Sequence, residues 1–374
     1  MIQLNYLEKL LGGVDVEWLP LGNLAEIGTG KSNRQDETED GEYPFYVRSK
    51  NILRSSTFQF DEKAIVVPGE GGIGDIFHFV EGKYALHQRA YRIKATSDVL
   101  DTKFLYHFMS SKFKQYILMK SVGATSISIR KPMLEGFQIP IPCPDNQEKS
   151  LAIQVEIVRI LDAFTAMTAE LTAELNMRKK QYNYYRDQLL SFEEGEGVKP
   201  MSIGDIYDFQ YGKGNTIPTE GGQYPVYGSN GVVGTHHEFN SEDSPVIGHI
   251  GAYAGIVNWG KGKHFVTYNG VICKHKSNEV LPQFAYYILL AQDFGSKAKN
   301  PSQPFVSYDT LKEPVVLIPS LAKQKRIVAI LDKFDALTNS ITEGLPREIE
   351  LRQKQYEYYR DLLLSFPKTE EAAA

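Results

Sequence analysis

The 374-residue chain contains little cysteine and no long hydrophobic run. Its two cysteines, Cys143 and Cys273, form no CxxC pair, which excludes a disulfide framework and fits a reducing cytoplasm. Since a membrane helix needs about 18 or more consecutive apolar residues, we expect no membrane span. The opening "MIQLNYLEKLLGGVDVEW" lacks the basic region and apolar stretch of a secretory signal, so we expect none.

Excess positive charge is also missing. Lys and Arg number 41 against 46 Asp and Glu, which gives a formal net charge of −5. The composition therefore does not indicate a chain that binds nucleic acid through its overall charge. Any affinity for DNA must come from local patches or from partner subunits.

The nucleotide and metal motifs of a self-contained enzyme are absent too. "GEGGIG" (Gly69–Gly74) has GxGxxG spacing, but the "DIFHFV" that follows favours a strand, whereas a nucleotide cradle needs a helix. No GxxxxGK[ST] loop occurs, nor an Asn-Pro-Pro-aromatic box of amino-methyltransferases. Asp75, Glu81 and Lys83 only loosely resemble a metal-dependent nuclease, and His236–His237 has no further ligands at metal-binding spacing. We expect no catalytic residue, metal site or cofactor in this chain.

What the sequence does contain is a long internal repeat. "RKKQYNYYRDQLLSF" (178–192) recurs as "RQKQYEYYRDLLLSF" (352–366) with three differences. Upstream, "QVEIVRILDAF" (154–164) recurs as "QKRIVAILDKF" (324–334), and a proline-stopped extended run precedes each copy. Each copy therefore predicts a strand, a turn and one long helix, over about 147–190 and about 321–364.

The first predicted helix carries a heptad pattern. Its apolar residues recur at steps of four and three, which predicts a seam that buries against another helix: Ile153, Ile157, Ile160, Phe164, Met167 and Leu171. The simplest partner is the second helix, and a coil between two chains is the alternative. A doubled tetrapeptide, "TAELTAEL" (Thr168–Leu175), adds a four-residue step to the first helix, whereas Gly344 and Pro346 predict a break in the second.

The regions between the helices repeat more faintly. "LPLGNLAEIGTGK" (19–31) parallels "MSIGDIYDFQYGK" (201–213), and each region has short β-runs, glycine turns and a helix near its end. The pattern Y-x-x-x-L-L of the helix tails also occurs at Tyr6–Leu11. We therefore expect an α+β fold of two similar globular domains separated by two long antiparallel helices, pseudo-two-fold and circularly repeated.

The expected boundaries follow from this organisation. The first globular domain takes 1–146, the first helix 147–192, the second domain 193–320 and the second helix 321–366, with a tail at 367–374.

This organisation, the segments "IPCPDNQEKSLAIQ" and "IVRILDAF", the doubled TAEL and the "QYxYYRDxLLSF" tails closely resemble the specificity subunit of Type I restriction–modification enzymes, in particular the IC family. The resemblance covers essentially the whole chain. It implies a non-catalytic, cytoplasmic subunit whose two target-recognition domains each read one half of a bipartite double-stranded DNA site, while the helices fix the gap. It also implies two adenine-methyltransferase (modification) subunits docked on the helices, joined by motor-nuclease (restriction) subunits. S-adenosylmethionine, ATP and Mg would belong to those partners.

Candidate DNA-reading residues lie on polar, glycine-punctuated stretches. Arg suits guanine edges, Asn and Gln suit adenine, and Lys and Ser suit phosphates. In the first domain the candidates are Lys31, Ser32, Asn33, Arg34, Arg48, Lys50, Asn51, Arg54, His87, Gln88, Arg89, Ser126, Ser128, Arg130 and Lys131. In the second domain they are Lys213, Asn215, Tyr227, Ser229, Asn230, His249, Tyr253, Tyr268, Asn269, Ser302, Gln303 and Tyr308.

Two other functions stay open at this point. A coiled-coil adaptor without DNA readout would show no sequence preference in any complex. A nuclease acting alone would cleave DNA with a metal ion and would lose activity when Glu81 and Lys83 are replaced.

Overall fold

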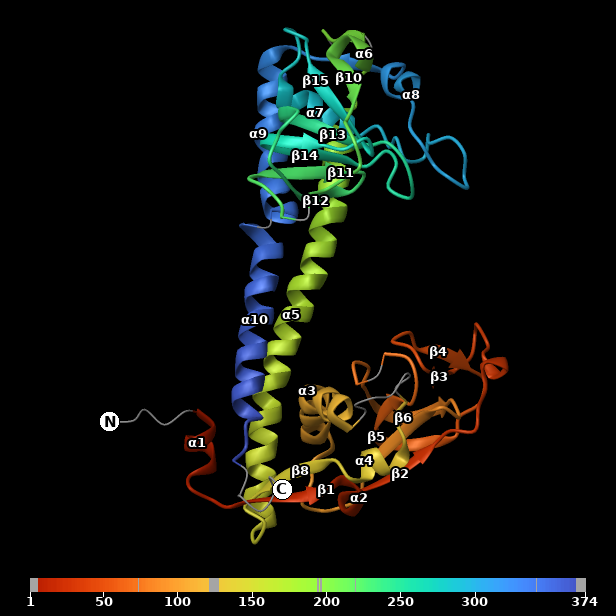
Figure 1. The fold of residues 1–374 in the computed structure, drawn as a ribbon, viewed down its shortest axis with the longest axis vertical. Coiled ribbons are helices and arrows are strands. Elements are labelled where there is room, and N and C mark those ends of the chain that lie inside the picture. Colours follow the sequence, from red (N-terminus) through yellow and green to blue (C-terminus); the bar gives the residue numbers. More distant parts are fainter. Residues whose placement is uncertain are drawn as a thin grey trace. The chain divides into compact units, whose positions relative to one another are not determined.

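The computed structural model describes residues 6–72, 74–120, 128–193, 195, 197–218, 220–340 and 342–367. The chain divides into two compact units, Met1–Leu171 with Ile349–Ala374, and Thr172–Glu348. Helix α5 (Gln147–Leu190) runs from the first unit into the second (Figure 1). Among the described residues, no helix combines the length and apolar character needed to cross a membrane.

The first unit is built on a six-stranded sheet in the order β2-β7-β5-β6-β3-β4. The strands are β2 (Ala25–Thr29), β3 (Tyr43–Tyr46), β4 (Leu53–Ser55), β5 (Phe60–Pro68), β6 (His78–Leu86) and β7 (Ala90–Ala95), and all pairings are antiparallel except β3 with β6. A two-stranded sheet pairs β1 (Val16–Pro20) with β8 (Gln138–Pro142). The helices are α1 (Tyr6–Leu11), α2 (Leu21–Leu24), α3 (Thr102–Lys120) and α4 (Lys131–Glu135), with a 3₁₀ turn at Arg34–Asp36.

The core of this unit lies where α3 packs against the sheet on one side and α5 on the other (Figure 1). Phe104, Phe113 and Ile157 are fully buried there. Leu7 of α1 and Leu363 of α10 join the same core, so the first and last described helices meet in one hydrophobic cluster. This contact explains the third copy of Y-x-x-x-L-L, because α1 and the tail of the last helix bury their leucines together.

The second unit has the same strand order, β10-β15-β13-β14-β11-β12. The strands are β10 (Tyr207–Tyr211), β11 (Tyr224–Gly228), β12 (Gly231–His236), β13 (Ser241–Gly248), β14 (Val257–Val266) and β15 (Gly270–His275), with β9 (Lys199–Ser202) paired to β16 (Val315–Ile318). Its helices are α6 (Ile203–Ile206), α7 (Pro282–Leu290), α8 (Tyr308–Lys312), α9 (Leu321–Asn339) and the start of α10 (Gly344–Leu363). Helix α7 contacts both β14 and α9, as α3 lies between sheet and helix in the first unit. The expected α+β fold, present twice, is confirmed.

The repeated motif QxxIVxILDxF attaches each globular domain to its long helix. The buried amide of Gln154 accepts a bond from the Asp101 backbone N–H (2.9 Å) and donates to the Val99 carbonyl (2.7 Å). Gln324 makes the same pair of bonds in the second unit, with the Leu281 N–H (2.8 Å) and the Glu279 carbonyl (2.9 Å). The glutamine therefore satisfies backbone groups at the start of α3 or α7, which accounts for its place in both copies.

The long helices also contact each other within each unit. Phe164 of α5 stacks on Tyr359 of α10 in the first unit, with ring centroids 5.2 Å apart. Tyr185 of α5 stacks on Phe334 of α9 in the second, at 5.8 Å. The early part of α5 thus meets the late part of α10, and the late part of α5 meets α9, which is the order of antiparallel helices.

The predicted heptad seam is wrong in detail. Leu161, outside the seam, is fully buried, whereas Met167, inside it, is 41% exposed. The buried side of early α5 runs through Ile153, Ile157 and Leu161, because that side faces the core around α3 as well as α10. The heptad pattern assumes one partner helix, so it could not predict that α5 also packs against the core around α3.

The predicted break in the second long helix is confirmed. Helix α9 ends at Asn339 and α10 begins at Gly344, so the helical stretch is split rather than continuous. Gly344 has φ +74°, and a Cβ there would lie 2.4 Å from the Ala336 carbonyl oxygen. Only glycine accepts this combination of left-handed backbone and close approach.

Candidate nucleic-acid interface

The predicted DNA-reading stretches of the first domain converge at one end of its sheet. Four backbone bonds hold them: Gly69 N–H to Arg89 O, Ile129 N–H to Gly69 O, Gln88 N–H to Ser32 O and His87 N–H to Tyr46 O, each 2.9 Å. The stretches after β2, after β3, after β5, in the β6–β7 turn and before α4 therefore form one loop cluster.

The second domain holds its stretches by equivalent bonds. They are His249 N–H to Asn269 O (2.8 Å), Val306 N–H to His249 O (3.0 Å), Tyr268 N–H to Gly214 O (2.8 Å) and Thr267 N–H to Tyr227 O (3.0 Å). These bonds, together with the parallel segments "EYPFY" and "QYPVY", set the correspondence of positions: Arg48 with Ser229, Glu70 with Ile250, and Arg89 with Asn269. The backbone is the same while the side chains differ.

The repeated Gly-Lys step after β2 and β10 has a steric cause. A Cβ on Gly30 would lie 1.8 Å from the Leu86 carbonyl oxygen, and one on Gly212 would lie 2.1 Å from the Thr267 carbonyl oxygen. Glycine lets the strand end pass against the β6–β7 or β14–β15 turn. The lysine that follows, Lys31 or Lys213, is exposed beside that turn.

In the first domain, two candidate arginines share one carboxylate. Arg48 Nη1 and Arg89 Nη1 each lie 3.0 Å from Glu70 Oε2. Hydrogen bonds from Arg89 and Arg48 lower the pKa of Glu70, so the carboxylate stays ionised. All three side chains are about half exposed. Arg48 and Glu70 border a cavity of about 240 Å³ that Arg34 and His87 also line.

Other first-domain candidates serve the loops themselves. Ser32 and His87 are buried, and Ser32 Oγ accepts a bond from Gln59. Arg54 donates to the carbonyls of Gly41 (2.8 Å) and Glu42 (3.1 Å). These side chains therefore stabilise the backbone of the loops.

The remaining first-domain candidates are placed as follows. Asn33 begins the 3₁₀ turn and Arg34 pairs with Glu37 at 3.6 Å. Lys31, Lys50, Asn51, Gln88 and Arg130 are exposed, Ser128 is half-buried, and Lys131 pairs with Glu135 at 3.5 Å. Ser126 lies outside the described residues.

The second domain presents an aromatic group instead. Tyr211 stacks on Tyr308 with centroids 4.2 Å apart and also contacts His249 (4.4 Å) and Tyr268 (5.8 Å). The Tyr211 backbone N–H donates to the Tyr308 hydroxyl at 2.8 Å. His249 is buried with Nδ1 3.1 Å from the Val306 carbonyl, whereas Tyr268 is 46% exposed.

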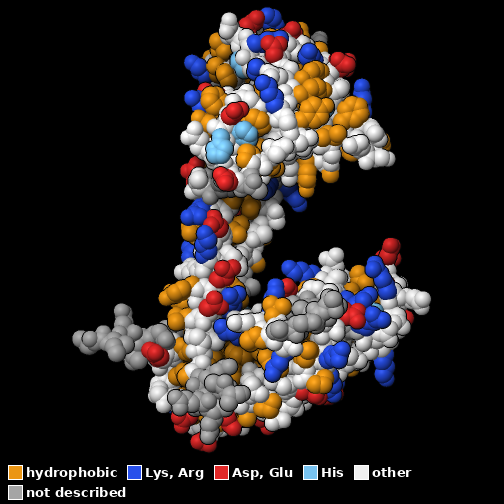
Figure 2. Space-filling model, viewed as in Figure 1, with side chains coloured by type: hydrophobic (Ala, Val, Ile, Leu, Met, Phe, Trp, Pro, Cys, Tyr) orange, Lys and Arg blue, Asp and Glu red, His pale blue; other side chains and the backbone are white. Residues whose placement is uncertain are grey.

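The other second-domain candidates divide by exposure. Lys213, Asn215, Asn230, Tyr253, Ser302 and Gln303 are exposed, and Ser229 and Asn269 are half-buried. Tyr227 is buried, and its hydroxyl donates to the Trp259 carbonyl at 3.2 Å. In Figure 2, Lys and Arg side chains are prominent around the β3–β4 region of the first domain, whereas hydrophobic side chains are prominent near α8 of the second.

Sequence reasoning missed Glu70, Gln59 and Tyr211. Acidic residues are not expected in a DNA site, and Tyr211 reads as an ordinary strand residue. The signal for Glu70 was its place beside Gly69 in a glycine turn, opposite two arginine-bearing turns.

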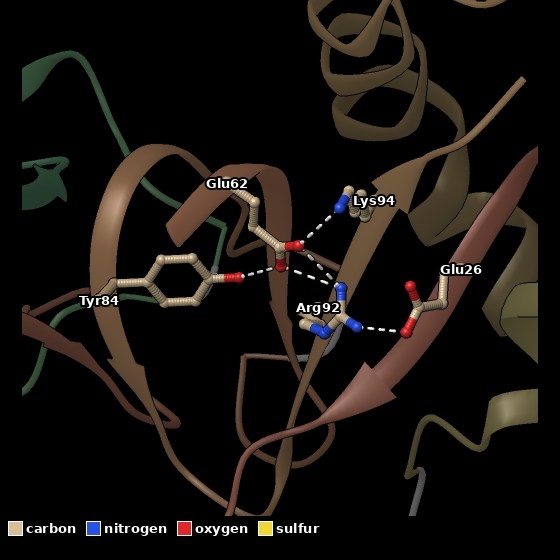
Figure 3. A network of polar contacts seen from close by, with 5 residues as sticks. All are labelled: Glu26, Glu62, Tyr84, Arg92 and Lys94. Carbon is tan, nitrogen blue, oxygen red and sulfur yellow. Dashed lines mark hydrogen bonds and ion pairs between the residues drawn. The ribbon is translucent and has the colours of Figure 1, made fainter. Parts of the chain in front are cut away.

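A separate polar network crosses the first sheet (Figure 3). Glu62 accepts bonds from the Tyr84 hydroxyl and from Arg92 Nη1, both at 2.9 Å, and lies 3.4 Å from Lys94 Nζ. Arg92 also pairs with Glu26. The Arg92 and Glu62 side chains are about 10% exposed or less, so this network ties strands β2, β5, β6 and β7 together rather than offering a binding surface.

The nuclease-like spacing does not assemble into a site. Asp75 pairs with Lys114 (2.8 Å) and Glu81 with Lys63 (3.0 Å), on separate elements. Within the described residues, no group of three His, Cys, Asp or Glu side chains could hold a metal ion. The nuclease hypothesis therefore has no geometric support.

Comparisons with known proteins point in one direction. A family model described as the Type I restriction modification DNA specificity domain matches residues 13–178 and again 195–351. The chain is 36% identical over 413 residues to the Type I restriction enzyme EcoR124I/EcoR124II specificity subunit of Escherichia coli, covering 99% of both chains. It is 36% identical over 381 residues to the EcoprrI specificity subunit of the same organism, covering 92% of this chain and 93% of that one.

Solved structures agree in fold. The S subunit of a Type-I restriction–modification system from M. genitalium superposes with a TM-score of 0.62 at 21% identity, covering 96% of this chain and 97% of that one. A chain from a type I R-M system, studied for complex assembly and conformational transition, superposes with a TM-score of 0.58 at 12% identity, covering 93% and 97%.

Proposed function

The chain belongs to the family of Type I restriction–modification specificity subunits, and we propose that it directs such an enzyme to an asymmetric, bipartite site on double-stranded DNA. Each globular domain reads one half of that site through its loop cluster. The family identifies the chain as the specificity component, so the chemistry is carried out by partner chains.

One observation carries this proposal. The two domains share backbone bonds throughout the loop cluster, yet equivalent positions carry Arg48, Glu70 and Arg89 in one and Ser229, Ile250 and Asn269 in the other. A palindromic site would be read by two identical clusters. Different side chains on one framework suit two different half-sites.

The partners are inferred from a second repeated surface. Tyr184 and Tyr358 occupy equivalent places in the two helix tails and are 59% and 65% exposed. A large aromatic kept exposed twice marks a contact site rather than packing. We assign this surface to two copies of a methyltransferase subunit, which supply S-adenosylmethionine and the adenine chemistry, and to which motor-nuclease subunits using ATP and Mg are added.

Three finer assignments belong to the same proposal. The doubled TAEL and the QYxYYRDxLLSF tails support membership of the IC family. The sparse, unpaired cysteines support a cytoplasmic location. Helix α5, which connects the two units, sets the gap between the half-sites together with α9 and α10.

The test is to produce the chain with its methyltransferase and to map methylated adenines by sequencing. We expect one asymmetric motif of two defined halves around a fixed gap, absent when the chain is omitted. A palindromic motif, or methylation that does not depend on the chain, would refute the proposal.

A further inference from the structure

Arg48 and Arg89 in the first loop cluster are both bonded to Glu70. This fixes the orientation of their guanidinium groups, which lysines or unpaired arginines would not have. Each uses one Nη1 on the same Glu70 oxygen, at 3.0 Å, and so keeps its Nε and Nη2 edge for another contact. The two guanidinium groups come from different loops, Arg48 after β3 and Arg89 in the β6–β7 turn. Glu70 therefore fixes the separation of two planar donor groups before any ligand arrives.

The charge arrangement favours a base edge over a phosphate. A phosphate approaching Arg48 and Arg89 would also approach the Glu70 carboxylate, which repels it. The guanine edge presents neutral acceptors, O6 and N7, that match an arginine bidentately. The half-exposed side chains and the adjoining cavity of about 240 Å³ leave room for such an edge to approach.

We propose that Glu70 is a positioning residue that presents Arg48 and Arg89 to guanine bases in the half-site read by the first domain. This inference rests on the proposed function and names the residues that set its first half. Holding the two side chains in advance reduces the conformational entropy lost on binding. Glu70 itself touches no base in this arrangement.

The second domain supplies an internal comparison. Its equivalent positions are Ser229, Ile250 and Asn269, which carry neither the two cations nor the carboxylate. Asn recognises adenine rather than guanine. The second half-site therefore lacks guanine at the positions that correspond to those read by Arg48 and Arg89.

The experiment measures methylation of the complex at DNA sites with defined base changes. Arg89→Asn and Arg48→Ser place the second domain's residues in the first, and Lys63→Ala on β5 is the matched control. We expect each arginine variant to lose discrimination for guanine at one position of the first half by about 10- to 100-fold, with the second half unchanged. Lys63→Ala should keep the motif of the unaltered chain.

Base analogues make the test specific to an atom. Replacing the contacted guanine by 7-deazaguanine removes N7 and should reduce methylation by the unaltered complex. The Arg89→Asn or Arg48→Ser complex that has lost that contact should methylate the guanine and 7-deazaguanine sites equally. Glu70→Ala should reduce discrimination at both guanine positions together, and Glu70→Gln should restore part of it because its amide oxygen still accepts hydrogen bonds. Thermal unfolding and assembly with the methyltransferase check that each variant is intact.

The outcomes separate this inference from the proposed function. A bipartite motif without guanine in the first half, or a Glu70→Ala complex with unchanged discrimination at both positions, would overturn the inference and leave the proposed function standing. Loss of every chain-dependent motif in the unaltered complex would overturn the proposed function itself.

Discussion

At the scale of single residues, each domain makes a polar contact with the same aspartate of the repeated helix motif, but with different side chains. His107 of α3 is buried with Nε2 2.9 Å from Asp162 of α5, and Lys103 reaches the same carboxylate at 2.6 Å. In the second unit Tyr287 of α7 donates to Asp332 of α9 at 2.5 Å. Both aspartates come from the LDxF part of the repeated motif, so the helix side of the contact is constant and the domain side varies.

His107 makes the stability of the first unit depend on pH. Burial lowers the pKa of His107, although its bond to Asp162 acts against this. Because the unfolded chain binds the proton first, the free energy of unfolding should fall as pH drops below about 6.5, by up to about 1.4 kcal/mol per pH unit. Burial would raise the pKa of Asp162, but bonds from Lys103 and His107 lower it, so that carboxylate loses its contribution only in more acidic solution.

The measurement is urea unfolding between pH 5 and 8 for the unaltered chain and for His107→Tyr, which copies the second unit. Below about pH 6.5, the free energy of unfolding of the variant should change less steeply with pH than that of the unaltered chain. It should retain some slope, because burial also lowers the pKa of His78 and His87 in the same unit. An identical slope would contradict the assignment to His107.

At the scale of elements, the long helices expose equivalent surfaces. Tyr185 and Tyr359 stack on Phe334 and Phe164, respectively, while the neighbouring Tyr184 and Tyr358 are more exposed, at 59% and 65%. The tail motif therefore uses one tyrosine for the helix pair and leaves the adjacent one exposed, where we propose that a partner subunit binds.

Replacing the outward tyrosines should change the stoichiometry of the complex. We expect Tyr184→Ala or Tyr358→Ala alone to weaken one methyltransferase copy and the double variant to weaken both, each by about 10-fold or more, since buried tyrosines dominate interfaces. Native mass spectrometry counts the subunits. Met177→Ala, also exposed on α5, is the control, and equal losses in all variants would argue against this surface.

The doubled TAEL gives an element-scale prediction about the gap. A third copy after Leu175 would lengthen α5 by about 6 Å. We expect only part of this length to lie along the DNA axis, where each base pair takes about 3.4 Å. The methylated motif should therefore keep both halves while its gap grows by about one base pair. Methylome sequencing of cells carrying the longer chain reads this directly. An unchanged gap would exclude α5 as the determinant of spacing.

Much of the element structure could be predicted because helices leave a regular pattern in sequence. The bounds of α5 and the break at Gly344 followed from periodicity and from glycine chemistry. The buried side of α5 did not, because Leu161 faces a core shared with α3 that no single period encodes. In the loop clusters, the buried Ser32, His87 and His249 looked like exposed polar residues, since sequence does not reveal which loop residue supports its neighbour.

At the scale of the whole molecule, the net charge of −5 limits the electrostatic attraction of the isolated chain to DNA. At Arg48 and Arg89, part of the local positive charge is balanced by Glu70. We therefore expect tight DNA binding to depend on phosphate contacts from the proposed partner subunits.

Salt dependence should separate the chain from its complex. In fluorescence anisotropy with a cognate duplex, we expect the isolated chain to bind about 100-fold more weakly than the complex and with a shallower salt slope, because it neutralises fewer phosphates. Equal affinities and slopes would mean that this chain supplies the phosphate contacts itself.

The glutamine attachment has a consequence for how such proteins acquire new targets. Among the described residues, the side-chain hydrogen bonds of Gln154 and Gln324 reach main-chain atoms, apart from the bond between Gln154 and Ser150 on the same helix. A foreign module could replace either globular domain without changes in the helix if it had the same main-chain geometry, a donor near Asp162 or Asp332, and an apolar face for the buried side of the helix. Genetic exchange of one coding segment would then alter half of the recognised motif and conserve the rest of the assembly.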